Sequence, residues 1–295
     1  MSTLLEGRVI EVTVDDIRLN GNRVTFNVEK TAKPDPNTAE VCVYNMTDSQ
    51  RQGISAKKAP LVTLAAGYGK NLTQIFYGNL IHATHEIDGA DIKTTLSTGD
   101  GIESYRKARI NAAFGPKTPA STVFRAITKA MGLKPGNSDK FMKRFQIGLL
   151  GQIFLTGTTV SGSASRELTA ICRSANLDWS IQDGKLQILD RSKALDSFAI
   201  KLDAQSGLVG SPSLCVKKGK TVVSGKCLII PDMFPGRQIS LDSKFVKGSF
   251  VLKKCTYSGD TFGSDWYCEF EGEGFVPKIA KAPISAATQR VLKHA

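Results

Sequence analysis

Short runs of alternating apolar and polar residues fill much of the first hundred positions and predict β-strands joined by turns. Val24–Val28 alternates residue by residue, and Val9–Val14 and Val41–Tyr44 are rich in strand-forming residues. Side chains of a strand point to its two faces in turn, so a period of two indicates a half-buried strand. Asn20-Gly21 lies between the first two strands and is a favourable turn. Several short strands with regular turn signals are typical of a barrel or a sandwich.

A similar pattern returns near the end of the chain, where Gly225–Gly272 predicts four short strands. Its second half resembles Leu61–Asp100, since both run from an apolar strand through a glycine-flanked strand to a final strand that ends near glycine. The matching segments are Val62–Leu64 with Ile239–Leu241, Ile75–Gly78 with Gly248–Leu252, and Ile92–Leu96 with Trp266–Phe270. A β-barrel that occurs twice in one chain suggests a ring-forming protein more than an enzyme. We therefore hypothesise an internal duplication.

Helical spacing replaces this alternation after Gly101. We expect helices over Ile102–Phe114 and Ala120–Met131, and the second has an apolar face at helical spacing. Gly132 is a plausible stop for that helix, because glycine readily adopts the left-handed conformation of a helix end. The run 145–160 fits either a strand or a helix, although its glycines disfavour a long helix.

A further helix and a β-hairpin follow. Ser163 and Ser165 are candidate N-caps, and the apolar residues from Leu168 to Ala175 form a helical face. Apolar residues then alternate on either side of Asp183-Gly184, which is a favourable hairpin turn; they are Leu177, Trp179 and Ile181 before it and Leu186 and Ile188 after it. This segment predicts a small α+β module that divides the two β-rich regions.

The predicted fold class is therefore α+β and mainly β, with two tube-like β-barrels separated by a small α+β module. We place the first barrel at residues 1–101, the α+β insert at 102–195 and the second barrel at 196–276. The last segment, 277–295, contains Pro283 and a possible short helix, and we expect an arm there because it shows no core pattern.

The formal net charge of +12 is unevenly distributed along the 295 residues. Residues 1–100 carry a net charge of −2, residues 101–180 carry +8, residues 181–276 carry +2, and the last 19 residues carry +4. A general nucleic-acid coat would be basic throughout, so this distribution indicates at most a specific anionic partner surface.

Membrane and secretion signals are missing from the sequence. No run of about 18 apolar residues occurs, and the N-terminus lacks a basic start followed by an apolar core. The six cysteines form no C-x-x-C pair, and most lie among strand-like residues. We therefore expect a cytosolic chain with reduced, mainly buried cysteines, and neither disulfides nor a zinc site.

No constellation of residues predicts catalysis. His82 and His85 are three apart on a strand-like segment, which places them on opposite faces and makes them poor joint metal ligands. The segment Gly157–Gly162 could bind an anion before a helix, but a strand-to-helix turn needs glycines in any case. Asp15 and Asp16 are neighbours in a turn and cannot converge on one bond. We expect no catalytic, cofactor-binding or metal-binding residue.

One short stretch alternates basic and aromatic residues. Phe141–Phe145 resembles a platform for single-stranded nucleic acid, in which rings stack on bases and cations follow phosphates. A half-buried strand with solvated charges explains the same five residues, and we favour that interpretation.

Five further stretches, in order, resemble one known family. They are Val43–Thr47 with Arg51; Val62–Tyr68 with Ile75–Gly78 and Asp100-Gly101; Leu168–Leu189; Gly207–Pro212; and Pro231 with Pro235–Arg237 and Gly259-Asp260. Their order and spacing resemble the baseplate hub proteins of tailed phages, which are related to the N-terminal part of type VI secretion spike proteins. The resemblance spans most of residues 5–275. It implies structural roles for Gly67, Tyr68, Gly78, Gly207, Gly210, Pro212, Pro231, Pro235, Gly236 and Gly248.

The resemblance also implies an assembly. Such a chain has two tube-like barrels, and three chains form a ring of six barrels that adapts a six-fold tail tube to a three-fold spike. The implied partners are a second and third copy, the tail tube or a tube-initiator protein, the central spike, and further the tape-measure and surrounding baseplate proteins. The implied location is the virion baseplate after assembly in the host cytoplasm, with no cofactor, membrane anchor or specific nucleic acid.

Two other classes of function remain open at this point. The basic middle segment would suit a nucleic-acid-binding protein built on barrel folds, and some spike assemblies carry cell-wall hydrolases. For the arm, we predict that Lys278, Lys281, Arg290 and Lys293 bind a partner, either a neighbouring subunit or the tube lumen. A disordered end would explain the same composition.

Overall fold

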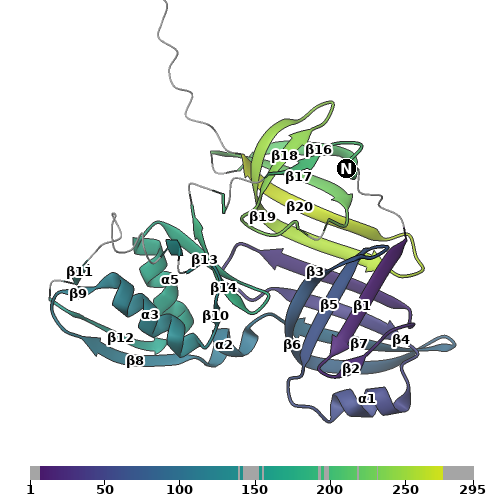
Figure 1. Ribbon diagram of the computed structural model, residues 1–295, viewed down its shortest axis with the longest axis horizontal. Coiled ribbons are helices and arrows are strands. Elements are labelled where there is room, and N and C mark those ends of the chain that lie inside the picture. Colours follow the sequence, from purple (N-terminus) through teal and green to yellow (C-terminus); the bar gives the residue numbers. More distant parts are fainter. Residues whose placement is uncertain are drawn as a thin grey trace, which may run out of the picture.

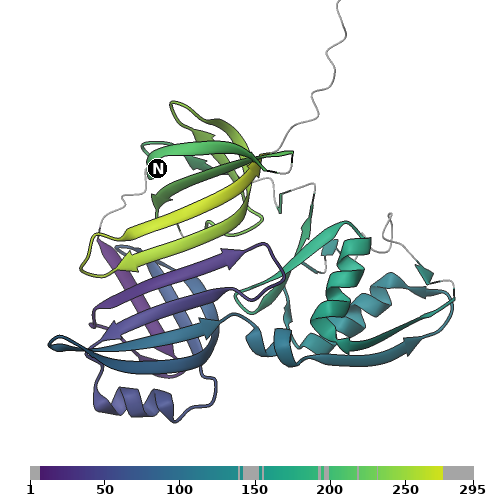
Figure 2. The same cartoon turned by 180° about the vertical axis from the view of Figure 1, so that it is seen from behind.

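The computed structural model describes residues 7–138, 140–141, 153–154, 156–191, 194–195, 199–217, 219–230 and 232–274. Within them, two β-units are stacked on each other and a helical module lies at their side (Figure 1). The view from behind shows the same arrangement, with the helix α1 at the far end of the lower β-unit (Figure 2). The fold is mainly β, as the sequence predicts.

The first unit consists of five strands in the order β3-β4-β7-β6-β5, and β1 and β2 extend its sheet beyond β5. Alternate residues of β3 are buried, which matches the predicted period of two. The helix α1 joins β4 to β5 and begins with a capping box between Thr47 and Gln50. The bounds are β1 Arg8–Val14, β2 Ile17–Arg18, β3 Val24–Thr31, β4 Thr38–Tyr44, α1 Asp48–Ser55, β5 Leu61–Tyr68, β6 Asn71–Asp88 and β7 Asp91–Gly99.

The second unit also consists of five strands, in the order β16-β17-β20-β19-β18. A short strand, β15, pairs with β18 in parallel. The bounds are β15 Ala199–Leu202, β16 Leu208–Lys217, β17 Lys220–Leu228, β18 Gln238–Asp242, β19 Lys247–Asp260 and β20 Trp266–Gly274.

The two units repeat one strand order and one register. A hairpin (β3–β4 or β16–β17) is followed by three strands that add in the same sequence. In the first unit Asn79 of β6 lies opposite Leu61 and Gly99, and in the second Val251 of β19 lies opposite Gln238 and Glu273. Each of these long strands then has an irregularity two residues further along the chain, at Ile81 and at Lys253.

This common register agrees with the internal match seen in the sequence. Val62 and Ile239 are each the second residue of their paired strand. Ile92 and Trp266 each lie opposite the sixth residue after the irregularity, since Ile92 pairs with Ile87 and Trp266 pairs with Gly259. The first and last pairs of segments that the sequence matched therefore occupy equivalent places, and the middle pair overlaps.

A direct strand pairing joins the two units. β3 pairs antiparallel with the second half of β19, so the strand order runs without a break from β16 to β2. One hydrophobic core spans both units and contains Phe76 and Leu96 from the first and Leu252 and Phe270 from the second. Pairings among the described residues do not join the two ends of this order, so an arrangement as two closed barrels stays a proposal.

The helical module has a separate core, in which Phe124 and Trp179 are almost fully buried. The helix α5 packs on β13 of the β13–β14 hairpin, α3 packs on α5 and β8, and β8 pairs with β12. Gly132 ends α3 at a φ of 66°, which confirms the predicted stop. The bounds are α2 Ile102–Lys107, β8 Arg109–Phe114, β9 Thr118–Pro119, α3 Ala120–Met131, β10 Lys134–Pro135, β11 Ile153–Phe154, β12 Thr158–Ser163, α5 Ala164–Ser174, β13 Leu177–Gln182 and β14 Lys185–Asp190.

The helix predicted over Ile102–Phe114 is wrong in its second half. It ends at Lys107, and Arg109–Phe114 forms β8, whose partner β12 lies some fifty residues further along the chain. Within 145–160, which the sequence left open, the described residues form β11 and the start of β12, so the strand alternative holds for them.

Candidate functional site

The first candidate feature is the junction of the two units, where β3 pairs along the second half of β19; we call it the β3–β19 joint. Seven residue pairs connect the strands, from Lys254 opposite Thr31 to Asp260 opposite Thr25. The Lys254 ammonium lies 2.6 Å from a Glu29 carboxylate oxygen on the exposed side of the joint. On the other side the ring of Phe26 covers Gly259, where a β-carbon would come within 2.5 Å of that ring. The joint thus combines backbone pairing with a close side-chain fit.

An ion pair closes the end of the joint. The Arg23 guanidinium donates to both carboxylate oxygens of Asp260, at 3.3 and 2.8 Å. These hydrogen bonds lower the pKa of Asp260 to about 2. Nearby, the ring of Trp266 meets the rings of Phe26 and Tyr68 edge to face, with centroids 6.0 and 6.1 Å apart. Residues from both units therefore hold the joint.

A second feature attaches the helical module to the first unit. Asp100, at the end of β7, is 1% exposed, and its carboxylate accepts hydrogen bonds from the backbone N–H groups of Asp183 and Gly184 at 2.6 and 2.8 Å. Burial raises the pKa of Asp100 to about 7, against the opposing effect of these N–H donors. The hairpin turn of the module is thereby fixed on a buried carboxyl group.

Further polar side chains of the first unit surround this attachment. The ammonium of the buried Lys30 lies 3.0 Å from both carboxylate oxygens of Asp183. The Asn37 amide donates to the Ile181 carbonyl oxygen and to the Gln182 side chain, at 2.8 and 3.0 Å. Buried polar groups need such partners, so the contact specifies one position for the module.

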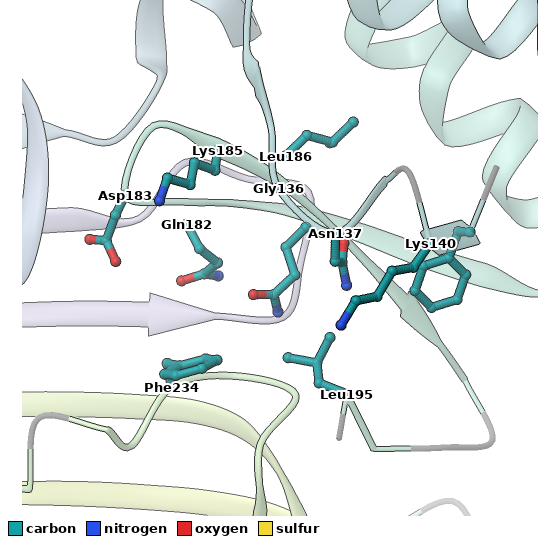
Figure 3. Close-up of a pocket in the computed structure, with 11 residues that line it drawn as sticks. Gly136, Asn137, Lys140, Gln182, Asp183, Lys185, Leu186, Leu195 and Phe234 are labelled. Carbon is teal, nitrogen blue, oxygen red and sulfur yellow. The ribbon is translucent and has the colours of Figure 1, made fainter. Parts of the chain in front are cut away.

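A cavity of about 340 Å³ lies where the module meets the second unit. Figure 3 shows Gln182, Asp183 and Lys185 of the β13–β14 hairpin on one side and Leu195 and Phe234 on the other. Its lining mixes ammonium, carboxylate, amide and apolar groups. The cavity therefore lies at the contact between the helical module and the second unit.

Two family-motif residues, Pro235 and Gly236, form hydrogen bonds at this contact. The Pro235 carbonyl oxygen accepts a hydrogen bond from the Gln187 amide at 2.8 Å. The Gly236 carbonyl oxygen accepts from the Leu195 N–H at 3.0 Å, and its own N–H donates to the Leu252 carbonyl at 2.8 Å. The loop before β18 thus contacts the module and the core strand β19 together.

The remaining family-motif residues of the first unit lie at close contacts. At Gly67 a β-carbon would come within 1.9 Å of the Asn71 carbonyl oxygen, so the tight β5–β6 hairpin excludes any side chain there. Gly78 lies against Gly99, with 2.8 Å between its would-be β-carbon and that backbone. Tyr68 is buried in the aromatic cluster of the joint.

In the second unit, Gly207 precedes β16, and Gly210 and Pro212 interrupt the register between β16 and β17. Gly210 has a φ of 69°, which favours glycine at this β-bulge. Gly248 lies in the first part of β19. Pro231 and the predicted partner-binding residues Lys278, Lys281, Arg290 and Lys293 lie outside the described residues.

Catalytic chemistry has no visible support among the described residues. No group of three or more His, Cys, Asp or Glu side chains there could hold a metal ion. His82 and His85 are both exposed, and His85 Nδ1 lies 3.0 Å from the Thr94 hydroxyl. All six cysteines are free thiols, and Cys215 alone among them is exposed. Of the described helices, none is long and apolar enough to cross a membrane.

Two segments, Gly157–Gly162 and Phe141–Phe145, were candidates for ligand binding in the sequence. Thr158–Gly162 belongs to β12, and only Gly157 lies before it, so most of the segment is a strand and not the expected strand-to-helix turn. Of the basic-aromatic stretch, Phe141 alone lies within the described residues. Sequence reasoning missed the attachment at Asp100, although it noted Asp100-Gly101 in the family resemblance and Asp183-Gly184 as a hairpin turn.

Comparison with solved structures shows which known folds this one resembles. A 43 kDa tail protein of prophage MuSo2 from Shewanella oneidensis aligns with a TM-score of 0.63 at 9% identity, covering 90% of this chain and 98% of its own. The tail protein from Neisseria meningitidis MC58 gives 0.62 at 8% identity, covering 90% and 96%.

The E. coli c3393 protein, a type VI secretion component described as structurally similar to the T4 tail proteins gp27 and gp5, gives a TM-score of 0.56 at 10% identity. The alignment covers 89% of this chain and 76% of that one. At such identities these likenesses show the fold alone. No curated protein matches the sequence.

The sequence itself matches a family profile described as baseplate hub gp41, over residues 9–272. That range contains both β-units and the helical module. It also agrees with the resemblance carried by the motif residues and with the tail-protein fold of the structural neighbours. The chain therefore belongs to the baseplate hub gp41 family of phage tail structural proteins.

Proposed function

We propose that the chain is the structural hub of a phage tail baseplate, in which three copies form a ring of six β-units. The repeated strand order carries this proposal, because a chain with two similar units can present six similar faces from three copies. Such a ring is a symmetry adaptor that joins a six-fold tail tube to a three-fold spike.

The partners follow from that position. One face of the ring binds the tail tube or a tube-initiator protein, and the other binds the central spike. The tape-measure protein and the surrounding baseplate proteins are further contacts, and the chain is located in the virion tail after assembly in the host cytoplasm. Its role is structural and not enzymatic. Family membership supports the baseplate location.

Analytical ultracentrifugation combined with negative-stain microscopy tests the ring. We expect particles of three 31.8 kDa chains with an open centre. A monodisperse monomer at micromolar concentration, with no binding to a tail-tube or spike protein, would contradict the proposal.

The alternatives give different results in simple assays. A nucleic-acid-binding protein would bind oligonucleotides at low salt and lose affinity steeply as salt rises. A cell-wall hydrolase would clear a peptidoglycan gel. We expect neither binding nor clearing, and either result would displace the structural role.

A further inference from the structure

The β3–β19 joint within the chain has a counterpart at two strand edges that lack a partner. β3 is the first strand of its five-strand unit, and β19 is the fourth strand of the other unit in chain order. The equivalent strands are β16 in the second unit and the second half of β6 in the first. Both of these have one edge without a strand partner among the described residues.

The free half of β6 comprises Ile81–Asp88. β5 pairs with β6 only as far as Asn79, so beyond that point β7 is the one neighbouring strand that the described residues provide. All residues from Ile81 to Asp88 except Ala83 are exposed, and Ile87 is 84% exposed. In contrast, alternate residues are buried in the equivalent stretch of β19, along which β3 pairs.

The free edge of β16 shows the same contrast. Leu214 is 49% exposed and Val216 is 74% exposed, although Leu214 lies opposite Val223, which is fully buried. Directly opposite residues share a sheet face, so Leu214 lies on the core-facing side of the sheet, at its edge strand. Its equivalent in the first unit, Val28, lies opposite Ala39 and is fully buried.

From this correspondence we infer that β16 of one chain pairs antiparallel with the free half of β6 of a second copy, and so repeats the β3–β19 joint between chains. The inference rests on the proposed ring, for which it names the interface. A second copy is the occupant because the chain already contains this joint once, between equivalent strands in a known register.

That register predicts which residues meet. Within the chain Val28 lies opposite Tyr257 and Glu29 lies opposite Thr256. The irregularities at Ile81 and Lys253 align β6 with β19, and the pairings with β4 and β17 align β3 with β16. Between chains, Leu214 therefore lies opposite His85, Cys215 opposite Thr84, and Val216 opposite Ala83.

The bulge of β16 fits this arrangement. In the chain's own joint the large Phe26 lies opposite Gly259. At the equivalent place between chains the large residue is Ile87, and it faces the bulge Gly210–Pro212, which begins with glycine. The bulky residue is thus on β3 in the joint within the chain, and on β6, the equivalent of β19, in the joint between chains.

The pairing is head-to-tail, because the first unit supplies one edge and the second unit supplies the other. Such an interface closes into a ring when the rotation between copies allows it, and otherwise continues as a filament. The proposed function sets the number of chains at three.

Disulfide trapping tests the register. Residues directly opposite in antiparallel strands have α-carbons about 4.5–5.5 Å apart, which a disulfide can span. In the variant Thr84→Cys, we expect oxidation to link the introduced thiol to the native Cys215 of the neighbouring copy, with a ladder on non-reducing gels that ends at three chains. His85→Cys is the matched control, since its side chain points to the opposite sheet face from Thr84. Thr84→Cys combined with Cys215→Ser must lose the link.

A second pair of variants needs no covalent bond. Leu214→Lys places a charge on the exposed edge strand, and we expect the three-chain particle to dissociate to monomers in sedimentation. Phe245→Lys is its control, because Phe245 is 71% exposed in the β18–β19 turn, away from both edges. We expect that variant to assemble as the wild type does.

The outcomes separate this inference from the proposed function. Three-chain particles without a Thr84→Cys link, and without an effect of Leu214→Lys, would overturn the interface and leave the ring standing. A ladder that continues beyond three chains would support the strand pairing and contradict the ring of three. A wild-type chain that never assembles would overturn both.

Discussion

The attachment of the helical module at Asp100 predicts a specific pH dependence of stability. The pKa of this carboxyl is about 7 in the folded chain, because it is buried, and about 3.9 in the unfolded chain. Between these values the folded state binds the extra proton. The stability from this proton is therefore fully present below about pH 4 and is lost as the pH rises through about 7.

The magnitude follows from the difference between these pKa values. Each pH unit between the two pKa values changes the free energy of unfolding by about 1.4 kcal/mol. Between pH 5 and pH 8, Asp100 then removes about 3 kcal/mol from the stability of the wild type. Asp260 and Asp203 have pKa values lowered to about 2, so they do not titrate in this window.

Urea unfolding of Asp100→Asn at the two pH values tests this reasoning. The amide cannot ionise, so we expect the variant to lack that loss while it keeps one oxygen as an acceptor. Trp179 is buried in the module and reports its unfolding by fluorescence when both proteins also carry Trp266→Phe. Asp100→Ala is the companion variant. It leaves two N–H groups without their acceptor, and we expect about 2–6 kcal/mol lower stability at both pH values. An equal pH dependence with and without the Asp100→Asn substitution would refute a raised pKa.

Two further changes test the joint and the arm. Gly259→Leu forces a side chain into the ring of Phe26, so we expect the two units to unfold separately in calorimetry, with stability lower by several kcal/mol, whereas Ser258→Thr, on the neighbouring residue, should have little effect. A single unchanged transition would contradict this importance of the joint. Removal of residues 277–295, with Lys278 and Arg290, should weaken assembly in sedimentation if the arm binds a neighbouring subunit, and unchanged assembly would indicate a disordered end.

The local elements could be predicted because their signals lie within a few residues. The apolar spacing of Ala120–Met131 identified α3, and the alternation around Asp183-Gly184 identified the β13–β14 hairpin. The helix over Ile102–Phe114 failed where a local signal competed with a distant partner. Arg109–Phe114 pairs with Thr158–Ser163, and no local pattern reveals such a pairing.

The contacts between parts of the chain were beyond local reasoning for the same cause. Asp100 and Gly184 are 84 residues apart, and β3 and β19 are separated by over two hundred residues. The sequence predicted a strand over Ile75–Gly78 and a separate strand-like segment around His82 and His85, whereas one strand extends from Asn71 to Asp88. Its second half is exposed except for Ala83, so it has no buried face that an alternating pattern could reveal.

The direction of the repeat explains why the pairing that we propose requires a second chain. Within the chain, β3 of the first unit already occupies the free half of β19 in the second unit. What remains is β16 of the second unit and the free half of β6 in the first, which belong to different units and do not pair within the described sheet. Unpaired strand edges bind other strands readily, and β16 carries a bulge and Lys217, both of which discourage indiscriminate pairing. A partner with the matching register satisfies the backbone groups despite these features. The same edge that resists random strands is thus suited to one partner, a second copy of the chain.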